Sequence, residues 1–171
     1  MKHIILVGFM GCGKTHVGQE LAKVMELPFV DMDERIVKRA GMPITDIFAK
    51  YGEQHFRQLE TKMLSELLAS KERTVISSGG GMPIQEANWP LLEDSIVIYI
   101  KAAVDVLISR LENDKKRPIL QGGNLHEKIT GLMDLRNPIY EQVSDIEVTT
   151  SEAPAYEVVG QIIEKLVEKP E

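Results

Sequence analysis

The 171-residue chain has a single cysteine, Cys12. One cysteine excludes an internal disulfide and a zinc site built from cysteines, and it is typical of proteins from a reducing compartment. Long hydrophobic runs are also missing. The apolar run Ile4-Ile5-Leu6-Val7 is too short to cross a membrane or to form the core of a secretion signal. We therefore expect a cytoplasmic protein with no membrane partner.

Aromatic residues make up 5% of the sequence, and basic residues are outnumbered by acidic ones, 20 to 26. The formal net charge of −6 argues against a nucleic-acid partner, because such partners are usually held by an excess of basic residues. The hydrophobic content of 43% and the charged content of 27% are ordinary for a globular protein. The length suits one domain, residues 1–171.

Short apolar segments alternate with longer segments in which apolar residues recur every three or four positions. The predicted strands are residues 3–8, 28–33, 74–78, 95–100 and 145–149. Most of them are unbroken apolar runs, as expected for strands buried on both faces. The alternation predicts an α/β fold with a parallel sheet covered by helices on both sides. We also expect Thr45 to cap a helix that Gly52 ends.

The stretch GFMGCGKT, residues 8–15, matches at every position the pattern G-x-x-x-x-G-K followed by Ser or Thr. A predicted strand precedes it, and an amphipathic helix carrying Leu21 and Val24 follows. Glycines let successive backbone N–H groups surround phosphate oxygens, and a helix N-terminus attracts the same anion. Lys14 would supply charge for the β- and γ-phosphates, and Thr15 a hydroxyl for Mg²⁺. This stretch predicts a nucleoside-triphosphate site.

Asp31 and Asp33 stand two residues apart at the end of the second predicted strand. A period of two places both carboxylates on one face, toward the crevice where parallel sheets bind ligands. One acid could act near Mg²⁺, and the other could accept a proton from an acceptor hydroxyl. The alternative is that the pair merely caps the helix that starts at Glu34.

Two further clusters bear on the phosphate acceptor. Arg57 and Glu60 are one helical turn apart, a spacing that suits a clamp for a carboxylate, although such pairs are more often exposed ion pairs. Gly79, Gly80 and Gly81 follow the third predicted strand, where they would let a ligand approach backbone N–H groups. A flexible turn explains these glycines equally well.

One segment, residues 113–124, fits neither period. It is polar, basic at its centre and closed by a pair of glycines. A connection of this length is uncommon in a compact domain unless it works as a lid or is disordered. We expect a lid that becomes ordered when nucleotide binds.

The order and spacing of GFMGCGKT, DMD, FRQLE, SGGG, KRP and LRNPIY resemble the shikimate kinases over most of the chain. The resemblance implies a P-loop kinase fold with a five-stranded parallel sheet in the order 2-3-1-4-5. It implies transfer of the γ-phosphoryl group of ATP to the 3-hydroxyl of shikimate, a step of chorismate and aromatic amino-acid biosynthesis. It further implies one Mg²⁺ per subunit and a monomer, with shikimate bound by residues in about the range 31–60.

The same resemblance implies the residues of the site. Those expected to contact ATP are Gly11, Cys12, Gly13, Lys14, Thr15, His16, Arg110 and Arg117. Those expected to bind shikimate are Asp33, Phe48, Phe56, Arg57, Glu60, Gly79, Gly80, Gly81 and Arg136.

Particular roles follow from the resemblance as well. Asp33 is the candidate base, Thr15 is a ligand of Mg²⁺, and Asp31 holds the metal through water. Arg57 and Arg136 bind the carboxylate of shikimate, an anionic ring that also carries three hydroxyls. With Lys14 and the metal, Arg117 of the lid would stabilise the charge that moves during phosphoryl transfer.

The sequence departs from the family at residues 149–154, TTSEAP, where many members carry an arginine near the adenine. This departure predicts looser selectivity for the nucleotide base. A kinase acting on gluconate would share the loop and the lid, but not Arg57, Arg136 and the three glycines in this register. A GTPase is disfavoured because no N-K-x-D pattern is present.

Overall fold

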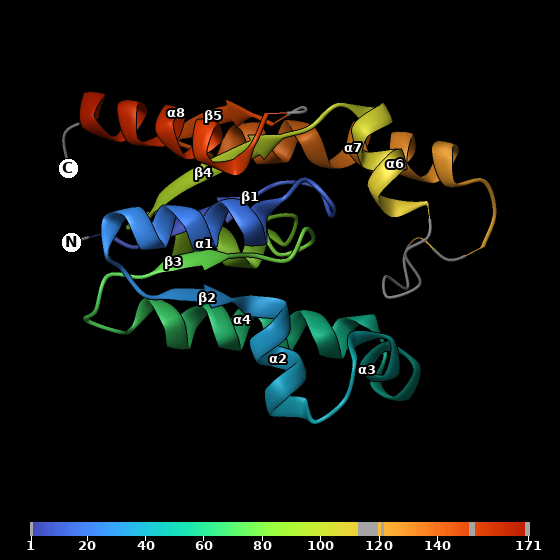
Figure 1. Cartoon of the computed structure of the whole chain (residues 1–171). Coiled ribbons are helices and arrows are strands. Elements are labelled where there is room, and N and C mark those ends of the chain that lie inside the picture. The colour runs from blue at the N-terminus through green and yellow to red at the C-terminus, as the bar shows by residue number, and fades with distance from the viewer. Residues whose placement is uncertain (1, 113–119, 121, 151–152, 170–171) are drawn as a thin grey trace.

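The structure is a computed structural model that describes residues 2–112, 120, 122–150 and 153–169. Its strands are β1 (Ile4–Val7), β2 (Phe29–Asp31), β3 (Val75–Ser77), β4 (Ile96–Lys101) and β5 (Ile146–Thr149). They form one parallel sheet in the order β2-β3-β1-β4-β5, as Figure 1 shows. The predicted sheet and its strand order are confirmed.

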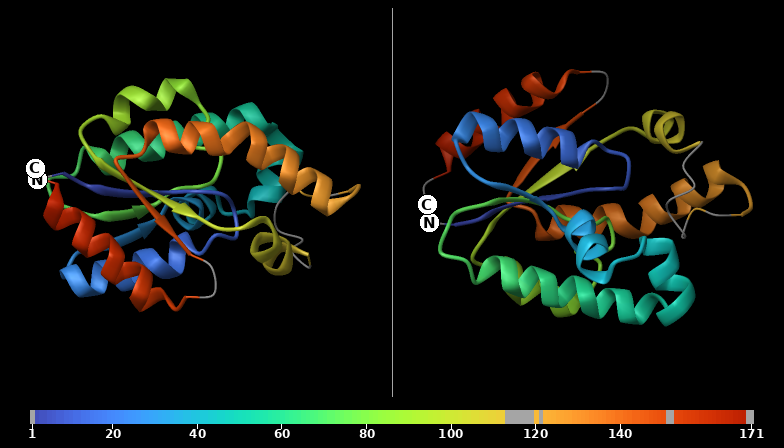
Figure 2. Two further views of the ribbon diagram at one scale, coloured as in Figure 1. Left: turned by 90° about the horizontal axis from the view of Figure 1, so that it is seen from above. Right: turned by 60° about the horizontal axis from the view of Figure 1, so that its bottom comes forward.

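Helices cover both faces of this sheet. In chain order they are α1 (Lys14–Met25), α2 (Met32–Ala40), α3 (Ile44–Tyr51), α4 (Glu53–Leu68), α5 (Trp89–Leu92), α6 (Val104–Leu111), α7 (Leu125–Val143) and α8 (Ala155–Glu168). A short 3-10 helix, η1 (Glu86–Asn88), precedes α5. Figure 2 shows α1 and α8 on one face, and α4, α5 and α7 on the other. None of the helices in the described residues is both long and apolar enough to cross a membrane.

The core explains why the strands are apolar without alternation. All four residues of the central strand β1 are fully buried, because helices cover the sheet on both sides. The helix after the phosphate loop packs closely on the same sheet. A Cβ added at Gly18 of α1 would lie 2.6 Å from the ring of Phe29. Val24 does not belong to this buried face as the sequence predicted, since 58% of it is exposed near the end of α1.

The start of α3 differs from the sequence-based prediction, whereas its end agrees with it. Thr45 does not cap α3, because the helix begins at Ile44 and its N-cap residue is Pro43. The carbonyl of Pro43 accepts the first helical hydrogen bonds, from the backbone N–H groups of Asp46 and Ile47. Gly52 ends α3 as predicted, with φ of 87°, a conformation that favours glycine.

The site is positioned by the carboxyl ends of the strands, which meet at one edge of the sheet. There β1 leads into the phosphate loop, β2 into α2, and β3 into the three glycines. This is the edge at which parallel sheets bind ligands. Residues 113–119 and 121, which carry most of the expected lid including Arg117, lie outside the described residues.

Candidate active site

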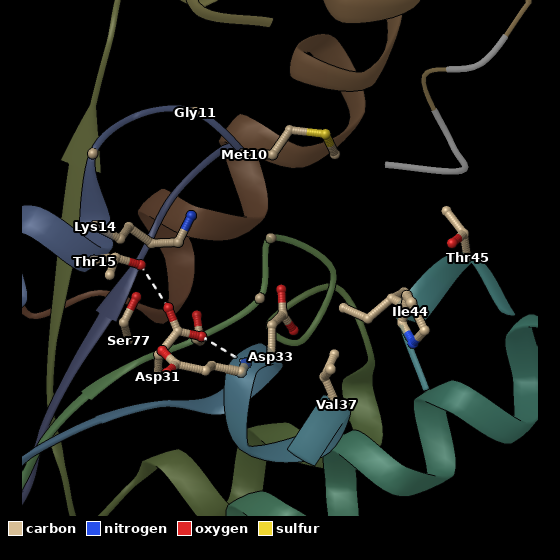
Figure 3. Close-up of a pocket in the computed structure, with 16 residues that line it drawn as sticks. Met10, Gly11, Lys14, Thr15, Asp31, Asp33, Val37, Ile44, Thr45 and Ser77 are labelled. Carbon is tan, nitrogen blue, oxygen red and sulfur yellow. Dashed lines mark hydrogen bonds between the residues drawn. The ribbon is translucent and has the colours of Figure 1, made fainter. Parts of the chain in front are cut away.

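A cavity of about 790 Å³ opens at this edge of the sheet. Its walls come from the phosphate loop, the junction of β2 with α2, the start of α3 and the glycines after β3. Figure 3 shows Lys14, Thr15 and Asp31 gathered on one side of the cavity, Ile44 and Thr45 on the opposite side, and Asp33 between them. The predicted phosphate loop and both acids therefore face one space.

The phosphate loop has the conformation that its glycines permit. Gly11 and Gly13 have φ of 78° and 95°, values that residues with a side chain rarely adopt. Lys14 is 8% exposed, and its ammonium group donates to the carbonyl oxygens of Gly8 at 2.8 Å and Phe9 at 3.1 Å. The N-terminus of α1 has no side-chain cap and no acid in its first turn, which leaves its N–H groups open to an anion.

Cys12 lies inside the same loop and is buried. Its carbonyl oxygen accepts a hydrogen bond of 3.2 Å from the hydroxyl of Thr150, which follows β5. On the other side, Arg110 of α6 donates from Nη1 to the carbonyl oxygen of Gly11 at 2.9 Å. Two segments distant in the sequence thus hold the loop through its backbone. His16, the remaining residue expected at the phosphates, is exposed in the first turn of α1.

The two acids reach the cavity differently from the prediction. The expectation that both extend from one face of a strand is wrong, because β2 ends at Asp31 and Asp33 lies in the first turn of α2. Asp31 is the N-cap, and its Oδ1 accepts from the backbone N–H of Glu34 at 3.1 Å. Its Oδ2 accepts from the hydroxyl of Thr15 at 2.6 Å. Asp31 therefore both caps the helix and contacts the phosphate loop.

The contact between Asp31 and Thr15 shows which oxygens could hold the expected Mg²⁺. Within the described ranges, no group of three or more His, Cys, Asp or Glu side chains could hold a metal ion. A nucleotide-bound Mg²⁺ needs no such group, since it takes one or two protein oxygens together with phosphates and water. Thr15 and Asp31 offer that limited set of oxygens next to the loop.

The glycine turn after β3 brings the acceptor residues together. A Cβ added at Gly79 would lie 2.7 Å from Oδ1 of Asp33 and 2.9 Å from Oε2 of Glu60. At Gly81 it would overlap the guanidinium group of Arg57, and at Gly80 it would lie 3.3 Å from Nη1 of Arg136. Side chains from α2, α4 and α7 therefore converge on three glycines, and an added side chain at Gly79 or Gly81 would displace them.

The Arg57–Glu60 pair is buried rather than exposed. Nη1 of Arg57 donates to Oε1 of Glu60 at 2.6 Å, with side-chain exposures of 15% and 1%. Burial raises the pKa of Glu60 to about 7, outweighing the attraction of Arg57. Burial acts to lower the pKa of Arg57, but Glu60 and then Glu53 reverse this and raise it above its ordinary value. Arg57 is therefore a permanent cation.

Tyr140 is a residue of this site that the sequence reasoning did not identify. It lies one turn after Arg136 on α7, is fully buried, and donates from its hydroxyl to the carbonyl oxygen of Gly80 at 2.6 Å. Burial raises the pKa of its hydroxyl well above the ordinary range, so the group remains a donor. Its position four residues after Arg136 in the motif LRNPIY was the available signal.

Several residues predicted to bind the acceptor are not among the described residues that line the cavity wall: Phe48, Phe56, Arg57, Glu60, Gly81 and Arg136. The rings of Phe48 and Phe56 contact each other, with centroids 5.3 Å apart. Arg57, Glu60 and Arg136 instead lie against the glycine turn. Arg117 lies outside the described residues, and so do Ser151 and Glu152 of the adenine-side segment.

Comparison with known proteins gives a consistent result. Residues 10–167 match the family model described as shikimate kinase. A shikimate kinase of Pseudomonas paraeruginosa is 42% identical over 171 residues, which is 99% of each chain. One of Thermodesulfovibrio yellowstonii is 40% identical over 166 residues, 96% of this chain and 95% of the relative.

The three-dimensional structure agrees with the sequence comparison. The shikimate kinase of Acinetobacter baumannii, solved in complex with shikimate, superimposes with a TM-score of 0.94 at 36% identity. The match covers 98% of this chain and 94% of that one. With matches of this extent in sequence and in fold, the chain belongs to the shikimate kinase family.

Proposed function

We propose that the protein is an ATP-dependent kinase that phosphorylates the 3-hydroxyl of shikimate, giving shikimate 3-phosphate and ADP in aromatic amino-acid biosynthesis. The observation that carries the proposal is the convergence of Asp33, Arg57 and Arg136 on the glycine turn beside a phosphate loop. Two cations and one acid at a turn without side chains match a ligand that carries one carboxylate and several hydroxyls.

The two arginines have donors to offer to a carboxylate. Nε of Arg57 and Nη1 of Arg136 are buried and have no hydrogen-bond partner within the described part of the chain. Buried donors without partners are costly, and an incoming carboxylate would satisfy both. We assign Glu60 to holding the guanidinium of Arg57 in place.

On the nucleotide side, we assign Lys14 and the N-terminus of α1 to the phosphates. The ammonium group has three donors, of which two make short contacts to the carbonyl oxygens of Gly8 and Phe9, while the third has only a weak contact of 3.8 Å to Sγ of Cys12 that a phosphate oxygen could replace. Arg110, which contacts the loop at Gly11, and Arg117 of the predicted lid would add further charge. A lid would also exclude water as an acceptor of the phosphoryl group.

Thr15 and Asp31 fit a single Mg²⁺. The hydroxyl of Thr15 already donates its proton to Asp31, so its lone pairs are directed elsewhere and can serve a metal. Asp31 would then reach the ion through water. When bound, Mg²⁺ neutralises charge on the β- and γ-phosphates.

Asp33 is the candidate base for the transfer. As the 3-hydroxyl oxygen bonds to the γ-phosphorus and the bond to the β-γ bridging oxygen breaks, the hydroxyl proton passes to the Asp33 carboxylate. The transition state is loose, so most of the stabilisation comes from fixed charges, and a weak base suffices. The monomeric state and the cytoplasmic location expected from the sequence stay predictions.

The test is a coupled assay of ADP release with Mg-ATP and shikimate, gluconate or no acceptor, on the wild type and on Asp33→Asn. We expect turnover that depends on shikimate and falls at least about a hundredfold in the variant. Unchanged ATP binding by the variant would confine the defect to the acceptor side. Absence of shikimate-dependent turnover in the wild type would refute the proposed substrate.

A further inference from the structure

A buried hydrogen-bonded chain lies outside the cavity and connects α4 to the glycine turn. Asn88, the last residue of η1, is fully buried, although asparagine is usually exposed. Its Oδ1 accepts from the hydroxyl of Thr61 on α4 at 2.7 Å, and its Nδ2 donates to the carbonyl oxygen of Met82 at 2.8 Å. Figure 2 shows the segment that contains η1 and α5 running beside α4.

The direction of the Asn88 amide is determined by its partners. If the amide were reversed, its oxygen would face the carbonyl oxygen of Met82 at 2.8 Å, and two acceptors would meet without a proton. One side-chain amide thus joins a helix hydroxyl to a turn carbonyl. An apolar residue of similar size could not make either bond.

Both ends of this chain reach residues of the proposed acceptor site. Thr61 lies one turn after Arg57, and its hydroxyl is 3.1 Å from the carbonyl oxygen of Arg57. Met82 closes the glycine turn, since its N–H donates to the carbonyl oxygen of Gly79 at 3.2 Å. Between them, the guanidinium of Arg57 lies directly against Gly81. This hydrogen-bonded chain therefore links the backbone of α4 to that of the glycine turn, and the distance between these two segments determines the position of Arg57.

We propose that Thr61 and Asn88 are positioning residues that hold α4 at a fixed distance from the glycine turn and thereby place Arg57 for the carboxylate of the acceptor. This inference rests on the proposed function. Neither side chain lines the cavity described above, and each contacts the backbone of an acceptor-site segment, Thr61 at Arg57 and Asn88 at Met82. The neighbouring bond from Nε1 of Trp89 to the carbonyl oxygen of Pro83, 2.8 Å long, holds the next residue of the turn in the same way.

The test uses Thr61→Val, which keeps the shape of the side chain and removes the hydroxyl, with Thr61→Ser as the matched control. We expect KM for shikimate to rise about three- to tenfold in Thr61→Val, with KM for ATP unchanged, because one hydrogen bond is lost on the acceptor side only. Thr61→Ser should keep the wild-type value. A rise of equal size in Thr61→Ser would show that the hydroxyl is not responsible.

Asn88→Leu provides the second arm, together with the double variant Thr61→Val/Asn88→Leu. Because both changes break the same chain, KM for shikimate in the double variant should equal that of the worse single variant rather than the product of the two effects. A merely structural role would lower the melting temperature and leave KM for shikimate unchanged, or raise both KM values together, and either result overturns the proposal. If Asn88→Leu does not fold, Thr61→Val decides alone.

Failure of the inference and failure of the proposed function are distinguishable in the same assays. If the wild type does not phosphorylate shikimate, the proposed function fails. If it does, and Thr61→Val has the wild-type KM for shikimate, the positioning role alone is wrong.

Discussion

At the scale of single residues, the acceptor site depends on a carboxyl group that has almost no contact with water. Glu60 lies between the cation of Arg57 and the acid of Asp33, and both influence its ionisation. Burial is the largest influence and favours the protonated form. Near neutral pH, Glu60 is therefore close to the midpoint of its titration, while Arg57 keeps its charge.

This placement predicts how stability depends on pH. The pKa of Glu60 is about 7 in the folded protein against an ordinary 4.5, so the folded state holds a proton that the unfolded state has lost in this interval. The contribution of Glu60 to stability is therefore present below pH 4.5 and declines as pH rises to about 7, with a slope of at most about 1.4 kcal/mol per unit.

Urea unfolding at several pH values checks this dependence. We expect Glu60→Gln to remove the decline in unfolding free energy between pH 5 and pH 7, a decline of at most about 1.4 kcal/mol per pH unit. Glu66→Gln is the control, because Glu66 is exposed and pairs with Arg39 at the surface. Parallel pH profiles for the wild type and Glu60→Gln would contradict the assignment.

Single residues also show what the sequence could not predict. The spacing of Arg57 and Glu60 suited a clamp for a carboxylate, and the family resemblance added Arg136. The spacing of Tyr140 from Arg136 could place both on one face of α7, but it could not identify Gly80 as the partner of Tyr140, and nothing indicated that Asn88 is buried, because these contacts join segments far apart in the chain. Such long-range partners depend on the packing of α7 and η1 and leave no periodic pattern.

At the scale of elements, strands were predicted better than helix ends. Apolar runs buried on both faces identify strands directly, and each observed strand overlaps its predicted range. The error at residues 28–33 arose because Met32 is apolar and prolongs the run, while Asp31 is already the cap of α2. The predicted N-cap at Thr45 was also wrong, because α3 begins at Ile44 and Pro43 occupies the cap position, with a φ of −63°.

The packing of α1 against the sheet gives a prediction for this scale. Gly18→Ala should destabilise the protein by about 1–3 kcal/mol, because the added methyl group would meet the ring of Phe29 and Leu6. The matched control is Gly160→Ala in α8, where nothing lies within 4 Å of the new Cβ. There the better helix propensity of alanine should stabilise by up to about 1 kcal/mol.

Thermal and urea unfolding of the two alanine variants measure the difference. Opposite signs of the change in unfolding free energy are expected. Stabilisation of both variants would mean that helix propensity, rather than the close approach of α1 to β1 and β2, determines the effect.

At the scale of the whole molecule, each substrate should stabilise the fold independently. A ligand present at a hundred times its Kd adds about 2.7 kcal/mol to the free energy of unfolding, or about 5–10 °C in Tm for a chain of this size. We expect such a shift with shikimate and with Mg-ATP. In Arg136→Met, the shikimate shift should vanish while the Mg-ATP shift remains.

Differential scanning fluorimetry with shikimate, gluconate and Mg-ATP separates the two sites. Loss of both shifts in Arg136→Met would indicate general damage to the fold. Retention of the shikimate shift would exclude Arg136 from the carboxylate site.

The central pairing of β1 with β3 has a consequence for how acceptor choice can change. The phosphate loop leaves the end of β1, the glycine turn leaves the end of β3, and Ser78 bonds back to Leu6 through both its N–H and its hydroxyl. The phosphate loop, which would bind ATP, and the glycine turn, which would bind the phosphate acceptor, thus follow adjacent strands, and the spacing of adjacent strands is about 4.8 Å in all β-sheets. The sheet therefore fixes the distance between the phosphate loop and the start of the glycine turn. Changes in helices α2 to α4, which carry Asp33 and Arg57, could alter the alcohol that is bound without altering that distance.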